Sequence, residues 1–354
     1  MSRQQAPRIR DLGEKRLVAG FREMAAAASG DNVVVGSGDD AAVMRAGGER
    51  LLLLTCDMMV EGIHFRRQWA RPGQIGRKAM VQNLSDVAAM GGEPAFAVAS
   101  IAAPGDLPAQ VLEEIAQGLI STASRYGAAV VGGDLVGSPG PIVIDVALTG
   151  WVEEELVLLR RGAQPGDAIL VTGTLGASSA GLAALRHELA ADSLPQLARA
   201  LQAHHEPRPR LAEARAIACT QRASAMMDLS DGLADDLPRL CCESSAGAQI
   251  HADRLPVDPS CFAVAARLGA DPLALAISGG EDYELLFTCP AQAVEDIAAA
   301  VSQAAGTPVT VIGEIVAQEK VLLVDADGAV RPLPAGFDHF DLGGSSELRG
   351  TQSS

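Results

Sequence analysis

The sequence predicts a mixed α/β (α+β) protein that is divided into two domains. Its 354 residues are roughly twice the number expected of one domain. Short apolar runs of β type alternate with segments of helical periodicity along most of the chain. The alternation breaks once, in the polar connector EEELVLLRRGAQPGD that begins at Glu153. We therefore expect one domain over residues 1–152, a second over residues 153–341 and a disordered tail over residues 342–354.

The first half begins with a predicted helix over residues 14–28, where apolar residues such as Leu17 and Met24 recur at helical spacing. Further helices are predicted over residues 74–91, which end at a Gly-Gly pair, and over residues 108–126. Strands are predicted in VVVGSGDDAAVM, LLLLTCDMMVEGIHF, AFAVASIAAP and PIVIDVALTGWV, and AAVVGGDLVG is predicted to be a strand that runs into a glycine turn.

The second half repeats the alternation. Helices are predicted over residues 178–191, 209–218 and 291–304, and one more begins at Asp231. The segment HEPRPR is predicted to be a connector, AGAQIHADRLP is followed by a single helix, and SGGEDYELLF is predicted to be a loop. Strands are predicted in AILVTG, SAMMDLS, TVIGEIV and KVLLVDADG.

Charge and composition exclude several classes of partner. Acidic residues outnumber basic ones by 44 to 28, so the net charge is −16. Such a surface repels nucleic-acid phosphates and anionic lipid headgroups, so neither nucleic acid nor membrane is an expected partner. The long uncharged run over residues 168–185 is interrupted by Thr, Gly and Ser and is not expected to span a bilayer.

The cysteine pattern indicates a reducing compartment. The six cysteines form no C-x-x-C pair and no zinc-type spacing, so we expect small buried side chains in a cytoplasmic protein. The first residues also lack the apolar segment of a secretory signal.

Aspartates recur at the ends of apolar runs or at helix starts. Carboxylate oxygens are the ligands that Mg²⁺ prefers, and each ion needs only one or two of them beside water and phosphate oxygens. A single aspartate of this kind is more often a helix cap or a turn residue, but five such clusters favour a site for several ions. The clusters are Gly38-Asp39-Asp40, Thr55-Cys56-Asp57, Asn83-Leu84-Ser85-Asp86, Gly132-Gly133-Asp134 and Asp228-Leu229-Ser230-Asp231-Gly232.

Several familiar motifs are absent from the sequence. It has no G-x-x-x-x-G-K-[ST] loop, no G-x-G-x-x-G fingerprint, no G-x-S-x-G elbow and no H-E-x-x-H. The segment GTLGASSAG follows a strand and opens a helix, so it could bind an anion or only pack closely.

The clusters, taken in order, resemble those of the thiamine-monophosphate kinases, which belong to the aminoimidazole-ribonucleotide-synthetase (PurM-like) superfamily. The matching segments lie between residues 36 and 340: GSGDDAAV, TCDMMVEGIHF, NLSDVAAMGGEP, VVGGD, RRGAQPGD, VTGTLG, HEPRPR, MDLSDGLADDL, SGGEDYELLF and GFDHF. The combination of EGIHF, SGGEDYEL and GFDHF is the most specific part.

The resemblance implies a PurM-like fold, a homodimer formed through the N-terminal domains, and transfer of phosphate from ATP to thiamine monophosphate with several Mg²⁺ ions. A phosphate acceptor is largely deprotonated at neutral pH, so no general base is required, and no Ser, His or Cys of the sequence lies in a pattern that would activate it as a nucleophile. The implied metal ligands are Asp40, Thr55, Asp57, Asp86, Asp134, Asp228 and Asp231. The implied ATP contacts are Gly133, Asp134, Arg160, Ser230 and Tyr126. The implied acceptor contacts are His64, Glu281 and Phe337.

Some points stay open in the sequence. Cys56 stands where the family usually has Thr, and only one of Arg160 and Arg161 is expected to reach phosphate. His204 and His205 are expected to face solvent. The alternatives are another ATP-using PurM-like enzyme, such as aminoimidazole ribonucleotide synthetase, and a non-catalytic protein that binds Mg²⁺ or nucleotide.

Overall fold

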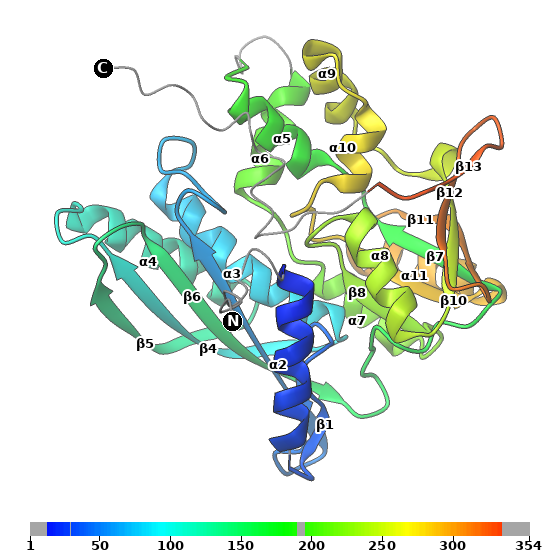
Figure 1. Cartoon of the computed structure of the whole chain (residues 1–354). Helices are drawn as coiled ribbons and strands as arrows, with labels where there is room; N and C mark the ends of the chain where they lie inside the picture. Colours follow the sequence, from blue (N-terminus) through cyan, green and yellow to red (C-terminus); the bar gives the residue numbers. More distant parts are fainter. Residues whose placement is uncertain (1–12, 29, 190–194, 335–354) are drawn as a thin grey trace, which may run out of the picture.

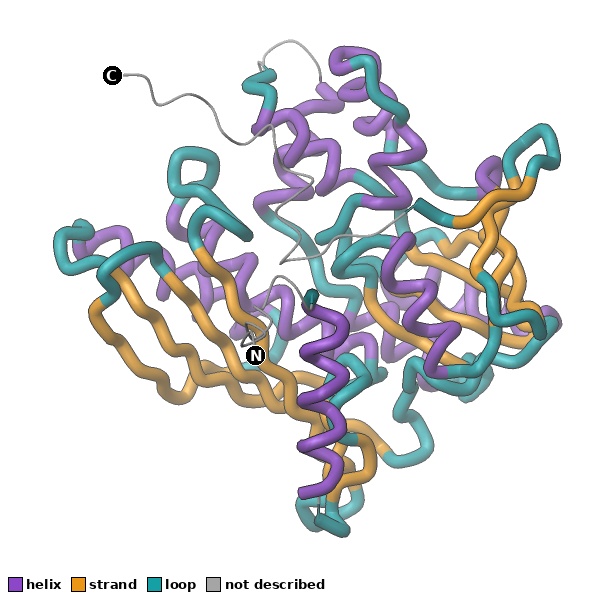
Figure 2. Tube along the Cα trace, in the orientation of Figure 1, coloured by secondary structure: helices purple, strands orange, loops and turns teal. Residues whose placement is uncertain are grey.

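The chain folds into two halves, each built on its own β-sheet (Figure 1). The structure is a computed structural model, and it describes residues 13–28, 30–189 and 195–334. Strands of the first sheet fall between residues 33 and 153, and strands of the second between residues 167 and 332. Figure 2 shows helices in the region between the two sheets. The predicted mixed α/β class is confirmed.

The first half places two helices on one face of a six-stranded sheet. Its elements are α2 (Glu14–Ala28), β1 (Val33–Val35), β2 (Ala42–Met44), β3 (Arg50–Val60), α3 (Pro72–Ala89), β4 (Glu93–Ala103), α4 (Ala109–Arg125), β5 (Ala129–Gly137) and β6 (Val143–Glu153). The strand order is β1-β2-β3-β6-β4-β5, and only β4 and β5 pair in parallel. Buried and partly exposed residues alternate strictly along β6, as expected for a sheet with one covered face.

Helices α3 and α4, which cover this sheet, cross at very short range because glycines line the crossing. A Cβ added at Gly76 would lie 1.9 Å from the carbonyl oxygen of Ile115. One added at Gly118 would lie 2.0 Å from the carbonyl oxygen of Gly73. The crossing therefore fixes α3, which carries several candidate site residues, firmly against the rest of the first half.

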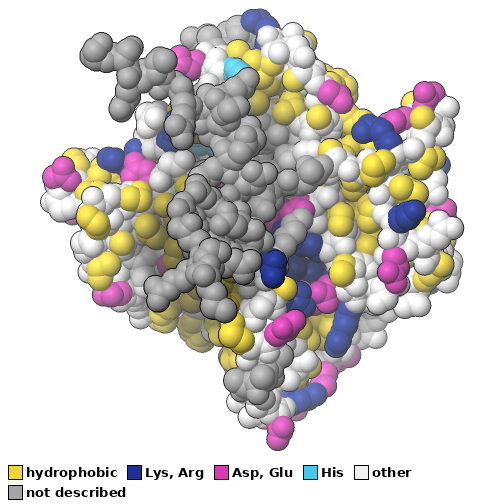
Figure 3. All heavy atoms as spheres, viewed as in Figure 1, with side chains coloured by type: hydrophobic (Ala, Val, Ile, Leu, Met, Phe, Trp, Pro, Cys, Tyr) yellow, Lys and Arg dark blue, Asp and Glu magenta, His cyan; other side chains and the backbone are white. Residues whose placement is uncertain are grey.

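The other face of the first sheet exposes large apolar side chains. Leu54 and Met58 on β3 and Phe96 and Val98 on β4 are each at least 40% exposed. Hydrophobic side chains are visible over this part of the molecule at the left of Figure 3. Monomeric soluble proteins rarely leave such a patch uncovered.

The second half has a seven-stranded sheet with helices on both faces. Its elements are β7 (Asp167–Thr172), α5 (Ala177–Arg186), α6 (Pro195–His205), α7 (Leu211–Cys219), β8 (Ala225–Asp228), α8 (Leu233–Glu243), β9 (Gly247–His251), α9 (Pro259–Leu268), α10 (Pro272–Ser278), β10 (Leu285–Pro290), α11 (Val294–Ala305), β11 (Val309–Val316), β12 (Val321–Val324) and β13 (Val330–Pro332). The strand order is β13-β12-β9-β11-β7-β10-β8. Helices α7 and α11 pack on one face, and α8 and α10 pack on the other.

Four of the predicted elements were wrong in detail. Helix α6 lies between the predicted helix over residues 178–191 and the segment HEPRPR, where no element was predicted. Two helices, α9 and α10, stand where one was expected. The predicted loop SGGEDYELLF ends inside strand β10. The pair Gly132-Gly133 lies within strand β5 and does not form a turn.

The cysteine prediction was only half right, since Cys56, Cys219 and Cys242 are exposed. Among the residues that the structure describes, no helix is long and apolar enough to cross a membrane.

Candidate active site

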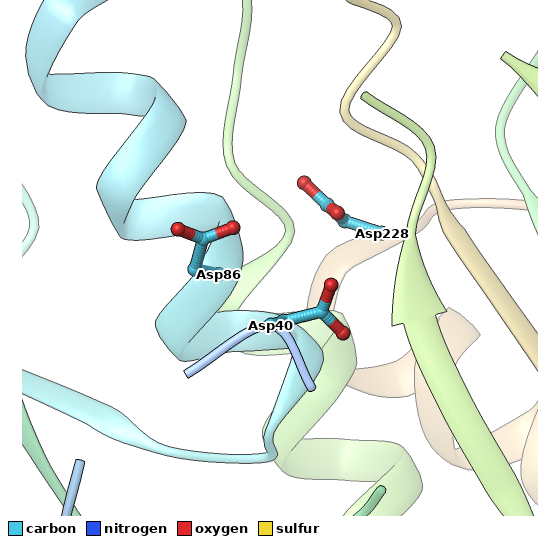
Figure 4. A group of neighbouring side chains, drawn as sticks. All are labelled: Asp40, Asp86 and Asp228. Carbon is cyan, nitrogen blue, oxygen red and sulfur yellow. The ribbon is translucent and has the colours of Figure 1, made fainter. Parts of the chain in front are cut away.

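Three carboxylates from separate parts of the chain converge where the two halves meet (Figure 4). Asp40 lies in the loop between β1 and β2, Asp86 lies on α3, and Asp228 ends β8. One carboxylate oxygen of each lies within 4.8 Å of one oxygen of the other two. We call Asp40, Asp86 and Asp228 the carboxylate cluster.

Hydroxyl groups hold two members of the carboxylate cluster in place. The Oγ of Ser85 donates to Oδ2 of Asp228 at 2.5 Å, and so links α3 to the second half. The Oγ1 of Thr55, on β3, donates to Asp86. The resemblance implied Thr55 as a metal ligand, whereas here its hydroxyl donates to Asp86, a member of the cluster.

Burial and mutual repulsion make Asp86, Asp228 and the neighbouring Asp57 hard to ionise. Burial, followed by the charge of Asp40, raises the pKa of Asp228 to about 8. Burial and the charges of Asp57 and Asp228 raise the pKa of Asp86 well above its ordinary value. Burial and the charge of Asp231 raise the pKa of Asp57 to about 6, so both belong to the same electrostatic group. A positive charge among these oxygens would relieve the repulsion.

Arg160 supplies part of that positive charge. Its Nε lies 3.2 Å from Oδ1 of Asp40, while its backbone N–H donates to Asp39 at 3.2 Å. The second oxygen of Asp40, Oδ2, is buried and has no hydrogen-bond partner. An unpartnered buried oxygen among all-oxygen donors fits a hard divalent cation such as Mg²⁺.

The segment that follows Asp228 is fixed by its own helix. The carboxylate of Asp236 accepts from the backbone N–H groups of Asp231 and Gly232 at 3.0 and 2.9 Å. Arg239 then donates to Asp231 at 2.6 Å. Ser230 contributes its carbonyl oxygen, which accepts from the N–H of Glu281 at 2.7 Å.

A second group of side chains surrounds Glu281. Lys78, on α3, lies 2.6 Å from its carboxylate, and Nδ1 of His204, on α6, lies 3.3 Å from Oε2. His204 also lies 3.1 Å from the hydroxyl of Ser178. The prediction that His204 faces solvent was wrong: its side chain is only 5% exposed, and burial holds its pKa well below the ordinary value.

His64 lies beside this second group. It lines a small pocket together with Lys78 and His204. Its Nδ1 accepts the backbone N–H of Val60 at 3.0 Å, which leaves Nε2 to carry the proton when the ring is neutral. Two of the three predicted acceptor contacts, His64 and Glu281, therefore lie near one another, and Phe337 lies outside the described residues.

Three predicted ATP residues lie apart from the carboxylate cluster. Asp134 and Gly133 are on the edge strand β5, where Asp134 is exposed and pairs in register with Ser100. Tyr126 ends α4 and packs against the core of the first half. The structure does not bring these residues to the cluster, and their roles stay predictions.

Comparisons with known proteins agree with this architecture. The model for the AIR synthase related protein N-terminal domain matches residues 38–152, and that for the C-terminal domain matches residues 164–325. Thiamine-monophosphate kinase of Rhodopirellula baltica is 35% identical over 315 residues, which cover 87% of this chain and 92% of that protein. The chain belongs to the thiamine-monophosphate kinase family. The enzyme of Escherichia coli K12 is 34% identical, with 93% of this chain and 98% of that protein covered.

Solved structures of thiamine-monophosphate kinases share the fold. AaThiL complexed with AMPPCP and TMP superimposes with a TM-score of 0.81 at 32% identity, over 95% of this chain and all of that chain. The HypE–HypF complex contains a chain with a TM-score of 0.71 at 21% identity, which shows the fold alone.

Sequence reasoning missed Lys78 and His204, which no thiamine-monophosphate kinase motif quoted above singles out. The signal was present in α3, where Lys78, Gln82 and Ser85 recur at helical spacing on a helix most of whose residues are buried. Lys78 forms an ion pair with Glu281, and the Ser85 hydroxyl donates to Asp228. A polar stripe on a buried helix indicates polar partners on the facing element.

Proposed function

We propose that this enzyme transfers the γ-phosphoryl group of ATP to the phosphate of thiamine monophosphate, giving thiamine diphosphate and ADP. The observation that carries the proposal is the carboxylate cluster at the junction of the two halves, in a chain that is about 35% identical to thiamine-monophosphate kinases over most of its length. In this reaction an acceptor phosphate oxygen forms a bond to the γ-phosphorus, and the bond from that phosphorus to the bridging oxygen of ADP breaks.

The acceptor needs no side chain to activate it. The second pKa of a phosphomonoester is near ~6, so its oxygen is largely deprotonated at neutral pH. Transfer should therefore be direct, in a complex that holds both substrates, and no phosphoenzyme should be isolable. The main obstacle is repulsion between two polyanions, which positioning and positive charge overcome.

Mg²⁺ fits the donors that the chain offers. We assign Asp40, Asp86 and Asp228 as its main ligands, with Asp57, Asp231 and Thr55 as further candidates. Asp134, on strand β5 apart from the cluster, is kept as a candidate ligand of a separate ion. When bound, Mg²⁺ would neutralise phosphate charge and align the attacking and leaving oxygens. Arg160 and Ser230, which border the cluster, are assigned to the ATP phosphates. Gly133 and Tyr126 are kept as candidate nucleotide contacts, and His64, Glu281 and Phe337 as acceptor contacts.

One assay tests the function. Purified protein is incubated with ATP, Mg²⁺ and thiamine monophosphate, and the products are separated by chromatography. Thiamine diphosphate and ADP should form in equal amounts, and a chelator should abolish both. Phosphate release with a purine-pathway amide and none with thiamine monophosphate would favour a synthetase, and ATP binding without turnover would favour a binding protein.

The active assembly that we propose is a homodimer, paired through the exposed apolar face of the first sheet. Phe96 and Val98 lie on that face, and a second copy of it would cover them. Phe96→Asp/Val98→Asp should run as a monomer in light scattering, whereas Val330→Asp, an exposed residue of the second half, should not change the mass. An unchanged mass for both variants would reject this interface.

The remaining assignments follow from the function. We propose the cytoplasm as the location, since ATP is the phosphate donor. Residues 1–152 and 153–341 are proposed as the two domains, a division supported by the absence of shared strands between the two described sheets.

A further inference from the structure

The carboxylate of Glu281 lies beside two buried groups, one from each half of the molecule. The Lys78 ammonium, 5% exposed, lies 2.6 Å from it, and the His204 imidazole, also 5% exposed, lies 3.3 Å from Oε2. Glu281 itself keeps 22% of its side chain exposed. The carboxylate therefore has a buried ammonium at ion-pair distance, while part of the Glu281 side chain remains exposed to solvent.

The backbone at Glu281 is fixed as firmly as its side chain. Its φ is +66°, a left-handed conformation that is unfavourable for a residue with a Cβ. Its N–H donates to the carbonyl of Ser230, in the segment that follows Asp228. At Gly280 an added Cβ would lie 2.4 Å from that same carbonyl oxygen. A backbone held in a strained conformation by its surroundings is often part of a functional site.

Lys78 and His204 also face a pocket. Both line it, together with His64, Phe65, Trp69 and Gln74. The guanidinium of Arg66 stacks 4.6 Å from the centre of a Trp69 ring. Lys78 and His204 thus contact Glu281 and also line the pocket that contains His64. His64 is the other predicted acceptor contact among the described residues.

We propose that Lys78 and His204 are positioning residues: they fix the Glu281 carboxylate toward the heteroaromatic end of the acceptor and thereby set the affinity for the acceptor, not for ATP. The inference rests on the proposed function. A carboxylate suits the exocyclic amine of an aminopyrimidine, and it recognises that amine selectively only if its direction is fixed. Lys78 serves this purpose because an ammonium that is buried keeps its ion-pair partner in place.

The test compares KM values of folded variants for both substrates. Lys78→Met should raise KM for thiamine monophosphate at least 10-fold and change KM for ATP less than 2-fold. Lys78→Arg, which retains the charge, should recover most of this loss. His204→Asn, whose amide can donate from the position of Nδ1, should be affected less than His204→Ala.

A double-mutant cycle shows whether Lys78 acts through Glu281. If it does, Lys78→Met/Glu281→Gln should be no more than 2-fold worse in acceptor KM than Glu281→Gln alone. The matched control is Arg215→Met, which removes another ion pair between the halves, at Glu153, and should leave both KM values unchanged.

The outcomes separate this inference from the proposed function. A wild-type protein without turnover of thiamine monophosphate rejects the function itself. The positioning role is rejected if the wild type is active but the effects of Lys78→Met and Glu281→Gln are additive. It is also rejected if the variants change the KM values for both substrates equally. Either outcome would assign the Lys78–Glu281 ion pair to contact between the two halves. If Lys78→Met does not fold, the Lys78→Arg and His204 variants decide by the same criteria.

Discussion

The guanidinium of Arg160 lies against the carboxylate of Asp40, with Nε 3.2 Å from Oδ1, and leaves the second oxygen of that carboxylate buried and without a hydrogen-bond partner. The pair joins the glycine-rich loop of the first half to the connector between the halves. One oxygen of Asp40 is thus neutralised by the protein, and the other is available to a cation.

Removal of Arg160 should destabilise the metal-free protein. Arg160→Met leaves Asp40 buried without its counter-charge, so we expect the free energy of unfolding to fall by about 2 kcal/mol. Mg²⁺ should restore part of this loss, because it supplies the missing charge. Urea titrations with chelator and with Mg²⁺ measure both effects. Arg161→Met, at the exposed neighbour, serves as the control, and equal stability of the two variants would contradict the prediction.

The carboxylates should be essential for turnover. Asp57→Asn, Asp86→Asn and Asp231→Asn each keep the side-chain shape but remove a charge, and each should lower kcat at least ~100-fold, about 2.7 kcal/mol of barrier. Asp106→Asn, at an exposed loop position, should have no effect. The measurement is the initial rate at saturating substrate concentrations. Near-normal turnover in all three variants would contradict the assignment of these aspartates as metal ligands.

Stability without metal should increase as the pH is lowered. The pKa of Asp228 is about 8 in the folded protein against an ordinary 3.8, so between these values the folded state binds more protons than the unfolded state. The stability that protonation provides is therefore lost as the pH rises toward 8. We expect the unfolding free energy in chelator to be larger at pH 6 than at pH 8 by about 2 kcal/mol.

Mg²⁺ should reduce this pH dependence, because a bound cation replaces the protons, and its binding at pH 7 should release protons. Calorimetry in buffers of different ionisation enthalpy detects the release. Asp228→Asn should weaken both effects, and the same slope with and without Mg²⁺ would be inconsistent with a cation in the cluster.

The acceptor contacts should be separable from the ATP contacts. Glu281→Gln and Phe337→Ala should each weaken binding of thiamine monophosphate by roughly 1 to 3 kcal/mol, because one loses a charged acceptor and the other an aromatic wall for the cationic ring. ATP-analogue affinity should change little. Each variant is titrated with ATP analogue and with thiamine monophosphate. An equal loss of affinity for both ligands would indicate a structural role, and a loss of affinity for ATP alone would show that these residues belong to the ATP pocket.

Many of the helices and strands can be predicted from local patterns in the sequence. The helix over residues 14–28 has the predicted bounds, and α3 and α4 lie within two residues of theirs, because each has clear apolar periodicity and a stop signal. Strand β10 was not predicted, because it lacks such a periodic pattern. Five of its six residues are buried, so the period of two that marks a half-exposed strand is missing.

The candidate site was predictable in its residue types but not in its pairings. Asp40, Asp86 and Asp228 could be singled out because carboxylates beside glycine or serine recur. Their convergence depends on how two sheets are set against one another, which no local pattern specifies. Lys78 and Glu281 are 203 positions apart, so their ion pair follows only from the tertiary arrangement.

Helix α3 carries Asp86 near its C-terminal end and Lys78 eight positions earlier. At a rise of about 1.5 Å per residue, the two lie about 12 Å apart along the axis. Helix α3 packs closely against α4 at the glycine crossing, so the distance between Asp86 and Lys78 is fixed. In the proposed function the reacting phosphates lie at the Asp86 end, whereas Lys78 at the other end contacts Glu281. We therefore expect selection of the acceptor by its length as well as by its chemistry: a phosphate ester with the same ring but a shorter or longer linker should not contact Glu281 and the carboxylate cluster at the same time.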